Sequence, residues 1–237
     1  MTTTLAIEMG ALVVFAEHRY FGISFPFDRS VALTKGYNQY LTVENTMMDY
    51  VELIKFIKED YNCEDRAVIA FGGSYGGMLA AWLRMKYPAT FQGALAASAP
   101  ILYFKNAPST REDAFSEVAT KDFADVYPVH QNCSKGIKEG FETLVSLKDN
   151  KTAGLGYAEI SSMYKTCSMV NSSQDIMDLY AHIQNAFLYM AMTDYPYESA
   201  FLQPMPASPV NVSCESYENI TVSDGKTPSM SRQIQYI

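Results

Sequence analysis

Residues 67–80 read Ala-Val-Ile-Ala-Phe-Gly-Gly-Ser-Tyr-Gly-Gly-Met-Leu-Ala, and no other stretch says as much about the architecture of the chain. Ala67–Phe71 is a short apolar run of β-type residues, which is typical of a strand buried in a parallel sheet. Two glycines break the run, and the apolar segment Met78–Tyr87 predicts a helix that is stopped by Pro88. The stretch therefore predicts a strand, a sharp turn around Ser74 and a helix.

The turn itself, Gly72–Gly76, has the pattern Gly-x-Ser-x-Gly. Between a strand and a helix this pattern predicts a nucleophile elbow, in which the serine backbone is strained and the flanking glycines leave room for strand and helix to pack. Gly77 extends the glycine cluster and is expected to help the backbone segments approach each other. Ser74 is the predicted nucleophile, exposed at the C-terminal edge of the sheet. The helix N-terminus makes the backbone N–H of Tyr75 the predicted oxyanion donor. A phosphate-binding loop is disfavoured, because no Gly-x-Gly-x-x-Gly register fits and no Lys-Ser/Thr pair follows.

Segments on both sides of the turn extend the pattern. Gly10–Glu17 is another apolar run and predicts a buried strand, and Gly93–Ala97 predicts a further one. Thr42 is the predicted N-cap of an amphipathic helix ending near Asn62, since apolar residues recur there at three- and four-residue spacings. This alternation predicts right-handed crossovers and a parallel α/β sheet.

The character of the chain changes after Pro100. Cysteines, glycosylation sequons and helical stretches such as Ser173–Met192 replace the alternation of strands and helices. We therefore predict two domains, residues 1–105 with the sheet and the nucleophile, and residues 106–237, which are mostly helical.

Composition excludes several classes of partner. The chain has 26 acidic and 18 basic side chains, and its net charge of -8 argues against nucleic acid or an anionic membrane surface as the main partner. No run approaches the roughly 20 apolar residues of a membrane-spanning helix. The N-terminus shows neither the basic nor the apolar region of a signal peptide. The 4 cysteines lack the CxxC spacing of a zinc or thioredoxin-type site, so we expect no metal.

Glycosylation sequons nevertheless favour the secretory pathway. Candidate acceptors lie in the C-terminal half, near three of the cysteines, at Asn132, Asn171, Asn211 and Asn219. This secretory composition without a visible signal peptide is a first indication that the chain is incomplete.

A catalytic triad also needs a histidine and an acid, which in this type of fold follow the serine along the chain. The chain has 3 histidines. His18 precedes the serine and is expected to join a polar network with Glu17 and Arg19 that supports the sheet edge. His130 is expected in a surface loop and His182 within a helix. We therefore expect the base and the acid to lie outside this sequence, and nominate no aspartate in their place.

Several blocks of the sequence resemble one family. Phe15–Gly22 (Phe-Ala-Glu-His-Arg-Tyr-Phe-Gly), Ala70–Ala80, Arg84–Pro88 and Gly93–Pro100 are similar to the lysosomal Pro-X carboxypeptidase and dipeptidyl peptidase II family of serine peptidases. The segment Asp194–Pro206 resembles part of that family's helical insertion. The blocks span most of the chain in the family's order, and a plain lipase elbow would not bring all of them.

The resemblance implies an α/β-hydrolase fold with a partial parallel sheet and a mostly helical cap after the nucleophile. It implies a peptide substrate with penultimate proline, and neither a cofactor nor a nucleic acid or membrane partner. For the full-length protein, it implies a lysosomal or secreted location, with a homodimer as one option. Family members are glycosylated and disulfide-bonded. Cys133 and Cys214 are candidates to pair, Cys63 is expected to be free, and the partner of Cys167 is expected outside the chain. Because the family's proteins are longer, the resemblance also implies a fragment that lacks the triad Asp and His and the second oxyanion donor.

Two other functions remain open at this point. An esterase or lipase would share only the fold and would show no preference for proline. A truncated product without the base would be inactive, with an unpaired sheet edge. Carboxypeptidase and dipeptidyl peptidase specificity are not distinguished by these residues.

Overall fold

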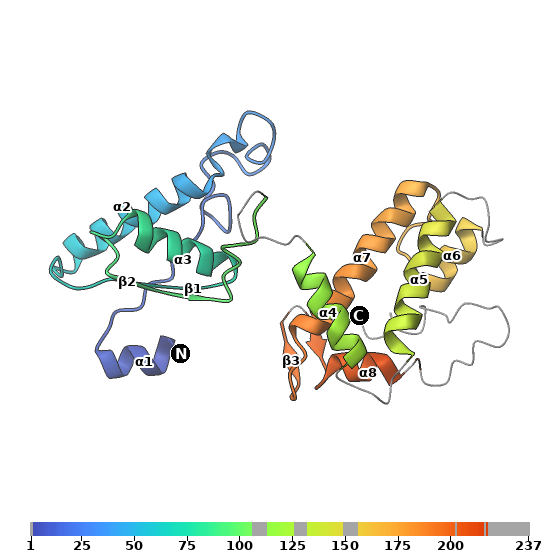
Figure 1. The fold of residues 1–237 in the computed structure, drawn as a ribbon. Coiled ribbons are helices and arrows are strands. Elements are labelled where there is room, and N and C mark those ends of the chain that lie inside the picture. Colours follow the sequence, from blue (N-terminus) through green and yellow to red (C-terminus); the bar gives the residue numbers. More distant parts are fainter. Residues whose placement is uncertain are drawn as a thin grey trace. The chain divides into compact units, whose positions relative to one another are not determined.

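The computed structural model describes residues 2–105, 113–125, 132–148, 156–201, 203–215 and 217. The chain divides into two compact units, unit 1 comprising Met1–Ser109 and unit 2 comprising Thr110–Ile237 (Figure 1). The boundary predicted from the sequence was residue 105. Unit 1 combines helices with a small parallel sheet, and the described part of unit 2 is mainly helical.

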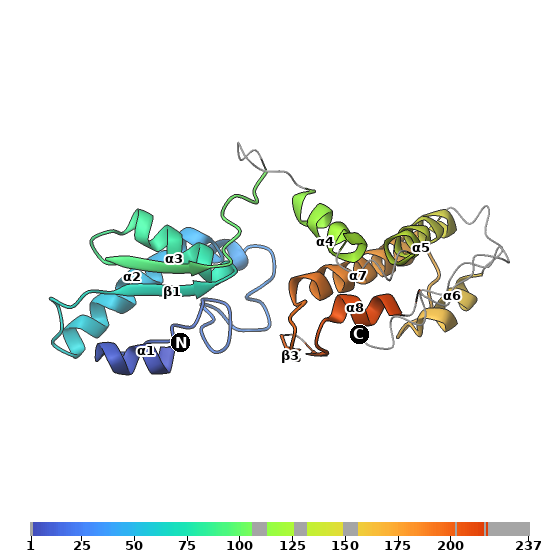
Figure 2. The same cartoon turned by 60° about the horizontal axis from the view of Figure 1, so that its bottom comes forward.

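Unit 1 is built around two parallel strands, β1 (Ile69–Gly73) and β2 (Gly93–Ala97), with Ile69 opposite Gly93 and Gly73 opposite Ala97. Helix α3 (Tyr75–Lys86) connects them and lies along the sheet in both views (Figures 1 and 2). Helix α2 (Val43–Asp60) packs against α3. Their shared core contains the buried side chains Met47, Leu79, Leu83 and Phe91.

The predicted helices of unit 1 are confirmed. Thr42 caps α2, and its hydroxyl accepts a hydrogen bond from the Asn45 N–H at 3.2 Å. Helix α3 begins at Tyr75, earlier than the predicted start at Met78, because the glycines continue the helical backbone directly from the turn. Strand β1 correspondingly runs two residues later than predicted and reaches the turn itself.

The strand predicted at Gly10–Glu17 is wrong. A short helix, α1 (Thr2–Met9), precedes this segment, and residues 11–18 belong to no strand. Leu12 and Phe15 are 58% and 85% exposed. Apolar β-type residues favour extended backbone, but a strand also needs a neighbour whose N–H and C=O groups lie in register. Among the described residues, the sheet of unit 1 pairs only β1 with β2.

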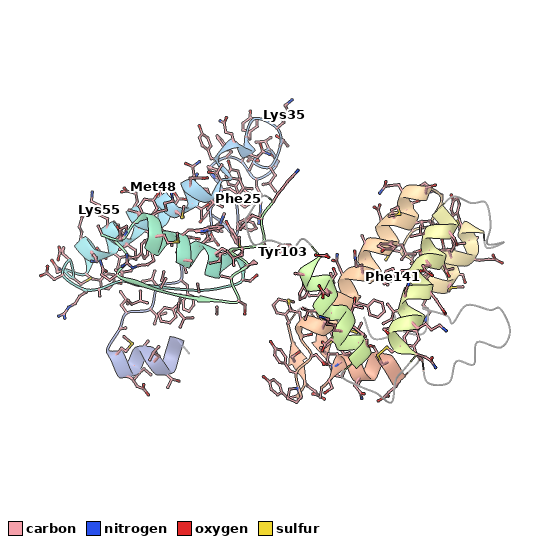
Figure 3. All side chains as sticks on the ribbon, viewed as in Figure 1. Phe25, Lys35, Met48, Lys55, Tyr103 and Phe141 are labelled. Atoms are coloured by element: carbon pink, nitrogen blue, oxygen red, sulfur yellow. A yellow bond between two sulfur atoms is a disulfide. The ribbon has the colours of Figure 1, made fainter. Side chains whose placement is uncertain are left out.

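Unit 2 packs its helices around an apolar core. The elements are α4 (Ala114–Asp125), α5 (Cys133–Lys148), α6 (Tyr157–Tyr164), α7 (Ser173–Met192), a hairpin of β3 (Ser199–Ala200) and β4 (Pro204–Met205), and α8 (Pro209–Glu215). Phe123, Leu144, Ile183, Phe187 and Val210 are buried together. Phe141 projects from α5 between the helices, with its ring 4.7 Å from that of Tyr180 on α7 (Figure 3).

Helix α7 confirms the helix expected at Ser173–Met192, and local chemistry explains its start. The Ser172 hydroxyl accepts from the Asp175 N–H at 3.2 Å, and the Asp175 carboxylate accepts from the Ser172 N–H at 3.1 Å. This reciprocal capping box satisfies amides that the first helical turn would leave unpaired. Hydrogen bonds from the Asn171 N–H and from Ser172 lower the pKa of the Asp175 carboxyl.

A disulfide joins the two ends of the described core of unit 2. Cys133 at the start of α5 and Cys214 in α8 are fully buried and bonded, with Cα atoms 5.3 Å apart and a sequence separation of 81 residues. Cys63 and Cys167 are free. In the same unit, burial and the charge of Asp194 raise the pKa of the Asp122 carboxyl on α4.

We expect the double replacement Cys133→Ala and Cys214→Ala to lower the free energy of unfolding of unit 2 by about 2–5 kcal/mol, because a disulfide closing so long a loop restricts the unfolded chain. Urea unfolding followed by helical circular dichroism measures this loss. The single tryptophan of these residues, Trp82, lies on α3 of unit 1, so its fluorescence follows unit 1 separately from the circular dichroism of the helices. Cys167→Ala, at an exposed free thiol, is the matched control and should stay within about 0.5 kcal/mol of wild type. An unchanged circular dichroism transition would contradict the prediction.

Candidate active site

Ser74 occupies the turn between β1 and α3. Its backbone has φ 54 and ψ -122, a positive φ that is strained for a residue with a side chain. The Ser74 N–H donates to the Ala97 carbonyl at 3.0 Å, and the Met78 N–H donates to the Ser74 carbonyl at 3.0 Å. The strained residue is thus tied both to the end of β2 and to the first turn of α3.

Two glycines allow the strand and the helix to approach each other here. A Cβ on Gly72 would lie 2.0 Å from the Gly76 carbonyl oxygen, and one on Gly77 would lie 2.9 Å from the Ala97 carbonyl oxygen. Gly73 and Gly76 would meet nothing within 4 Å. The sequence pattern assigned the packing role to Gly72 and Gly76, with help from Gly77; the close contacts in the structure are at Gly72 and Gly77, and Gly76 has none. Gly76 matters through its carbonyl, which occupies the space beside Gly72.

The serine hydroxyl is open to solvent at this turn. Ser74 is exposed, and within the described residues its hydroxyl makes no capping hydrogen bond to α3. Tyr75 is the first residue of α3, so its backbone N–H is one of those with no acceptor inside the helix. Together they place a hydroxyl and an unused amide side by side at the positive end of a helix.

The segment Glu17–Tyr20 fastens the neighbouring loop. The Glu17 carboxylate accepts from the Ser24 hydroxyl at 2.6 Å and from the Ile23 N–H at 3.0 Å, which lowers its pKa. Gly22 has a φ of 55, which favours glycine, and a Cβ there would displace the Glu17 carboxylate, 1.6 Å away, from its hydrogen bonds. The Tyr20 hydroxyl donates to the Tyr37 carbonyl at 2.6 Å.

Arg19 and His18 connect this segment to the helices. Arg19 makes a bidentate ion pair with Asp49 on α2, with Nε–Oδ2 and Nη2–Oδ1 distances of 2.7 and 2.6 Å. His18 contacts the Tyr75 hydroxyl at 3.0 Å and the Thr46 hydroxyl at 3.2 Å. The polar network expected around His18 is present, but it holds α2 and the start of α3 and does not border a paired strand.

No histidine of the described residues contacts Ser74. Both ring nitrogens of His18 are engaged, Nδ1 by the Arg19 carbonyl at 2.7 Å and Nε2 by the Tyr75 hydroxyl at 3.0 Å, with the Thr46 hydroxyl 3.2 Å from Nε2. His182 is exposed on α7 in unit 2, and His130 lies outside the described residues. The structure thus shows the predicted nucleophile and amide together, without a base at hydrogen-bond distance in the described part of unit 1.

The predicted glycosylation acceptors differ in exposure. Asn132 and Asn171 are exposed near the starts of α5 and α7, whereas Asn211 is half-buried within α8. Asn219 lies outside the described residues. A search of the described segments finds no cluster of three acidic, cysteine or histidine side chains that could hold a metal ion. None of their helices is long and apolar enough to cross a membrane.

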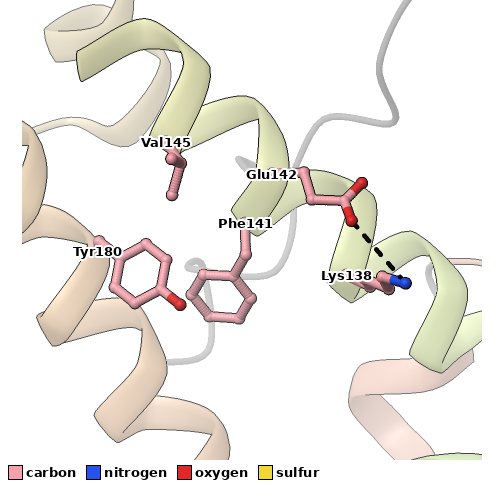
Figure 4. A pocket seen from close by; sticks show the side chains of 5 residues that line it. All are labelled: Lys138, Phe141, Glu142, Val145 and Tyr180. Atoms are coloured by element: carbon pink, nitrogen blue, oxygen red, sulfur yellow. Dashed lines mark ion pairs between the residues drawn. The ribbon is translucent and has the colours of Figure 1, made fainter. Parts of the chain in front are cut away.

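Unit 2 has an open pocket of about 440 Å³ between α5 and α7 (Figure 4). Its lining residues are Lys138, Phe141, Glu142, Val145 and Tyr180. Lys138 pairs with Glu142 at 3.8 Å along one face of α5, so both charges are already partnered. The lining contains no serine or cysteine that could act as a nucleophile, and we do not assign catalysis to it.

A serine at a strained strand-to-helix turn, beside the first amide of a helix, is typical of the class of serine hydrolases that carry a nucleophile elbow. Comparison with known proteins narrows the class. The family model of serine carboxypeptidase S28 matches residues 1–236, and the chain belongs to this family of serine peptidases.

The similar proteins agree with this family. The chain is 41% identical over 221 residues to lysosomal Pro-X carboxypeptidase of Bos taurus and 42% identical over 221 residues to that of Homo sapiens, in each case over 93% of the chain and 43% of the relative. It is 35% identical to prolyl carboxy peptidase like protein 5 of Caenorhabditis elegans, over 98% of the chain and 44% of the relative. The chain thus spans less than half the length of these relatives.

Proposed function

We propose that this chain is the nucleophile-bearing part of a serine exopeptidase that cleaves peptide bonds after proline. The observation that carries the proposal is the exposed Ser74 at φ 54 between a parallel strand and a helix. We assign residues 1–105 to an α/β-hydrolase core and residues 106–237 to a helical cap. The parallel pairing of β1 with β2 and the helical content of unit 2 support this assignment.

In the proposed reaction, the Ser74 hydroxyl oxygen attacks the carbonyl carbon of the prolyl residue, and its proton passes to a histidine base. The negative charge that develops on the carbonyl oxygen is stabilised by the Tyr75 N–H. The C–N bond then breaks, the amine leaves with the proton, and water hydrolyses the acyl-enzyme. The base and the acid are proposed to come from residues other than those described in unit 1, because both His18 nitrogens are already engaged.

The proposed substrate and location follow the relatives. The three relatives compared above are named as carboxypeptidases that act at proline, and two of them are named as lysosomal. We propose peptides with penultimate proline as substrates, and a lysosomal or secreted location. Asn132 and Asn171 are the exposed candidates for glycosylation there. A homodimer is one proposed assembly of the complete protein. The reaction as written requires no cofactor.

The test compares two peptides that differ only in having proline or alanine at the penultimate position. For the protein expressed from its complete coding sequence, we expect kcat/KM to be at least about tenfold higher for the proline peptide, because a pocket shaped for the ring loses contacts with alanine. Amidating the C-terminus or acetylating the N-terminus then separates carboxypeptidase from dipeptidyl peptidase action. Equal rates with both peptides, together with rapid hydrolysis of short acyl esters, would favour an esterase and overturn the proposal.

A further inference from the structure

The side chain of Tyr75 is held by a residue far away in the sequence. Its hydroxyl lies 3.0 Å from Nε2 of His18, 57 positions earlier, and the two rings are 5.7 Å apart. Tyr75 is also the residue whose backbone N–H stands next to Ser74 at the start of α3. A contact that fixes the Tyr75 side chain therefore acts on the first residue of the helix.

The hydrogen bonds around His18 define which nitrogen carries the proton. The Arg19 carbonyl, 2.7 Å from Nδ1, can only accept, so Nδ1 is the donor. The Thr46 hydroxyl donates to the Thr42 carbonyl at 2.9 Å and has no second proton for the ring. In the neutral imidazole, Nε2 is then an acceptor, and the available donor is the Tyr75 hydroxyl. The phenol of Tyr75 is protonated at neutral pH and can be that donor, and burial raises its pKa further.

The imidazole itself is held on several sides. Thr46 is fully buried on α2, and the ring of Phe21 meets the imidazole edge-on at 5.2 Å. The next residue, Arg19, is anchored to Asp49 by two short hydrogen bonds and to the Tyr40 carbonyl at 3.0 Å. Since these contacts come from α2 and from the loop, His18 has little freedom to follow Tyr75 if α3 shifts.

We propose that His18 is a positioning residue for the reaction at Ser74, because it holds the Tyr75 hydroxyl and thereby fixes the amide that faces the oxyanion. The inference rests on the proposed function of Ser74. Since an oxyanion forms only after attack, a displaced amide lowers kcat and leaves KM nearly unchanged.

Two amide variants separate the two ring nitrogens. The amide of glutamine reaches as far as Nε2 and can accept from Tyr75, whereas the amide of asparagine reaches only as far as Nδ1 and can keep the bond to the Arg19 carbonyl. In the protein expressed from its complete coding sequence, His18→Asn is expected to lower kcat about tenfold, and His18→Gln to stay within about threefold of wild type. Tyr75→Phe should show the same roughly tenfold loss, and the double variant Tyr75→Phe with His18→Asn should be no worse than either single change.

A proline-containing peptide is the substrate, and kcat and KM are measured separately. Tyr61→Phe, at a tyrosine that is 62% exposed, is the control and should match wild type. Urea unfolding of each variant, followed by helical circular dichroism, reports whether the protein is still folded. The inference is wrong if His18→Asn and Tyr75→Phe both retain wild-type kcat. It is also wrong if kcat falls equally in His18→Gln and His18→Asn while Tyr75→Phe keeps its full kcat. In either case a wild-type protein whose activity depends on Ser74 would leave the proposed function intact.

Discussion

Ser74→Ala is expected to lower kcat for a proline-containing peptide by about 10⁶-fold, the scale on which loss of a serine nucleophile acts in enzymes of this kind. Alanine keeps the Cβ and therefore the same backbone strain at φ 54, so the change removes the hydroxyl without relaxing the turn. The fold should be unaffected, because the described structure shows no capping bond from this side chain to α3. The measurement is steady-state hydrolysis by the protein expressed from its complete coding sequence.

Ser98→Ala provides a matched control for this experiment. Ser98 is also an exposed serine with positive φ, 49, and it directly follows strand β2, but no helix begins there. We expect it to keep kcat within about threefold of wild type, as surface changes usually do. Residual activity in Ser74→Ala close to wild type would refute the nucleophile assignment. The polypeptide 1–237 by itself should show no turnover above its own Ser74→Ala variant, and clear Ser74-dependent cleavage by it would show that the base lies within these residues.

Gly72→Ala is the second change for which we expect a large effect. The added Cβ would lie 2.0 Å from the Gly76 carbonyl oxygen and 2.6 Å from the Gly77 nitrogen, and both are backbone atoms that cannot rotate away. Strand β1 and helix α3 must therefore separate at the turn, which we expect to cost about 1–3 kcal/mol of stability in unit 1. A displacement of about 1 Å at a reacting group costs about 10²-fold in rate, so kcat should fall by at least that factor.

Gly73→Ala, one residue later, is the control for the clash. Gly73 belongs to the same motif, has no positive φ, and its added Cβ would meet nothing within 4 Å. Urea unfolding followed by helical circular dichroism measures the stability of both variants, while kcat is measured in parallel. Equal stability and equal kcat for the two alanine variants would show that the close approach of strand and helix at Gly72 is not needed.

Local sequence was sufficient for the elements that local interactions build. The turn at Ser74 was predicted from a glycine pattern between an apolar strand and an apolar helix, and the structure has a positive φ there. Helix α2 was predicted from its apolar spacing and from Thr42, whose hydroxyl makes the capping bond. Each of these signals lies within a few residues of the element that it specifies, because capping, turn strain and helical periodicity act over one or two turns of chain.

The same reasoning failed where an element depends on a distant neighbour. Gly10–Glu17 has the composition of a strand, but residues 11–18 lack a ladder partner among the described residues. The close contact at Gly77, and the lack of one at Gly76, depend on where the end of β2 places the Ala97 carbonyl. Neither fact can be obtained from the residues of the segment itself.

By itself, the sequence determined the family and the helices that carry their own caps and apolar faces, and it predicted the nucleophile and the adjacent oxyanion amide. Only the tertiary structure decided that His18 contacts Tyr75, that Arg19 anchors to Asp49, and which glycines lie against backbone. The physical reason is that hydrogen bonds and steric contacts between residues tens of positions apart depend on the path of the whole chain in space. The order of residues within one segment does not specify that path.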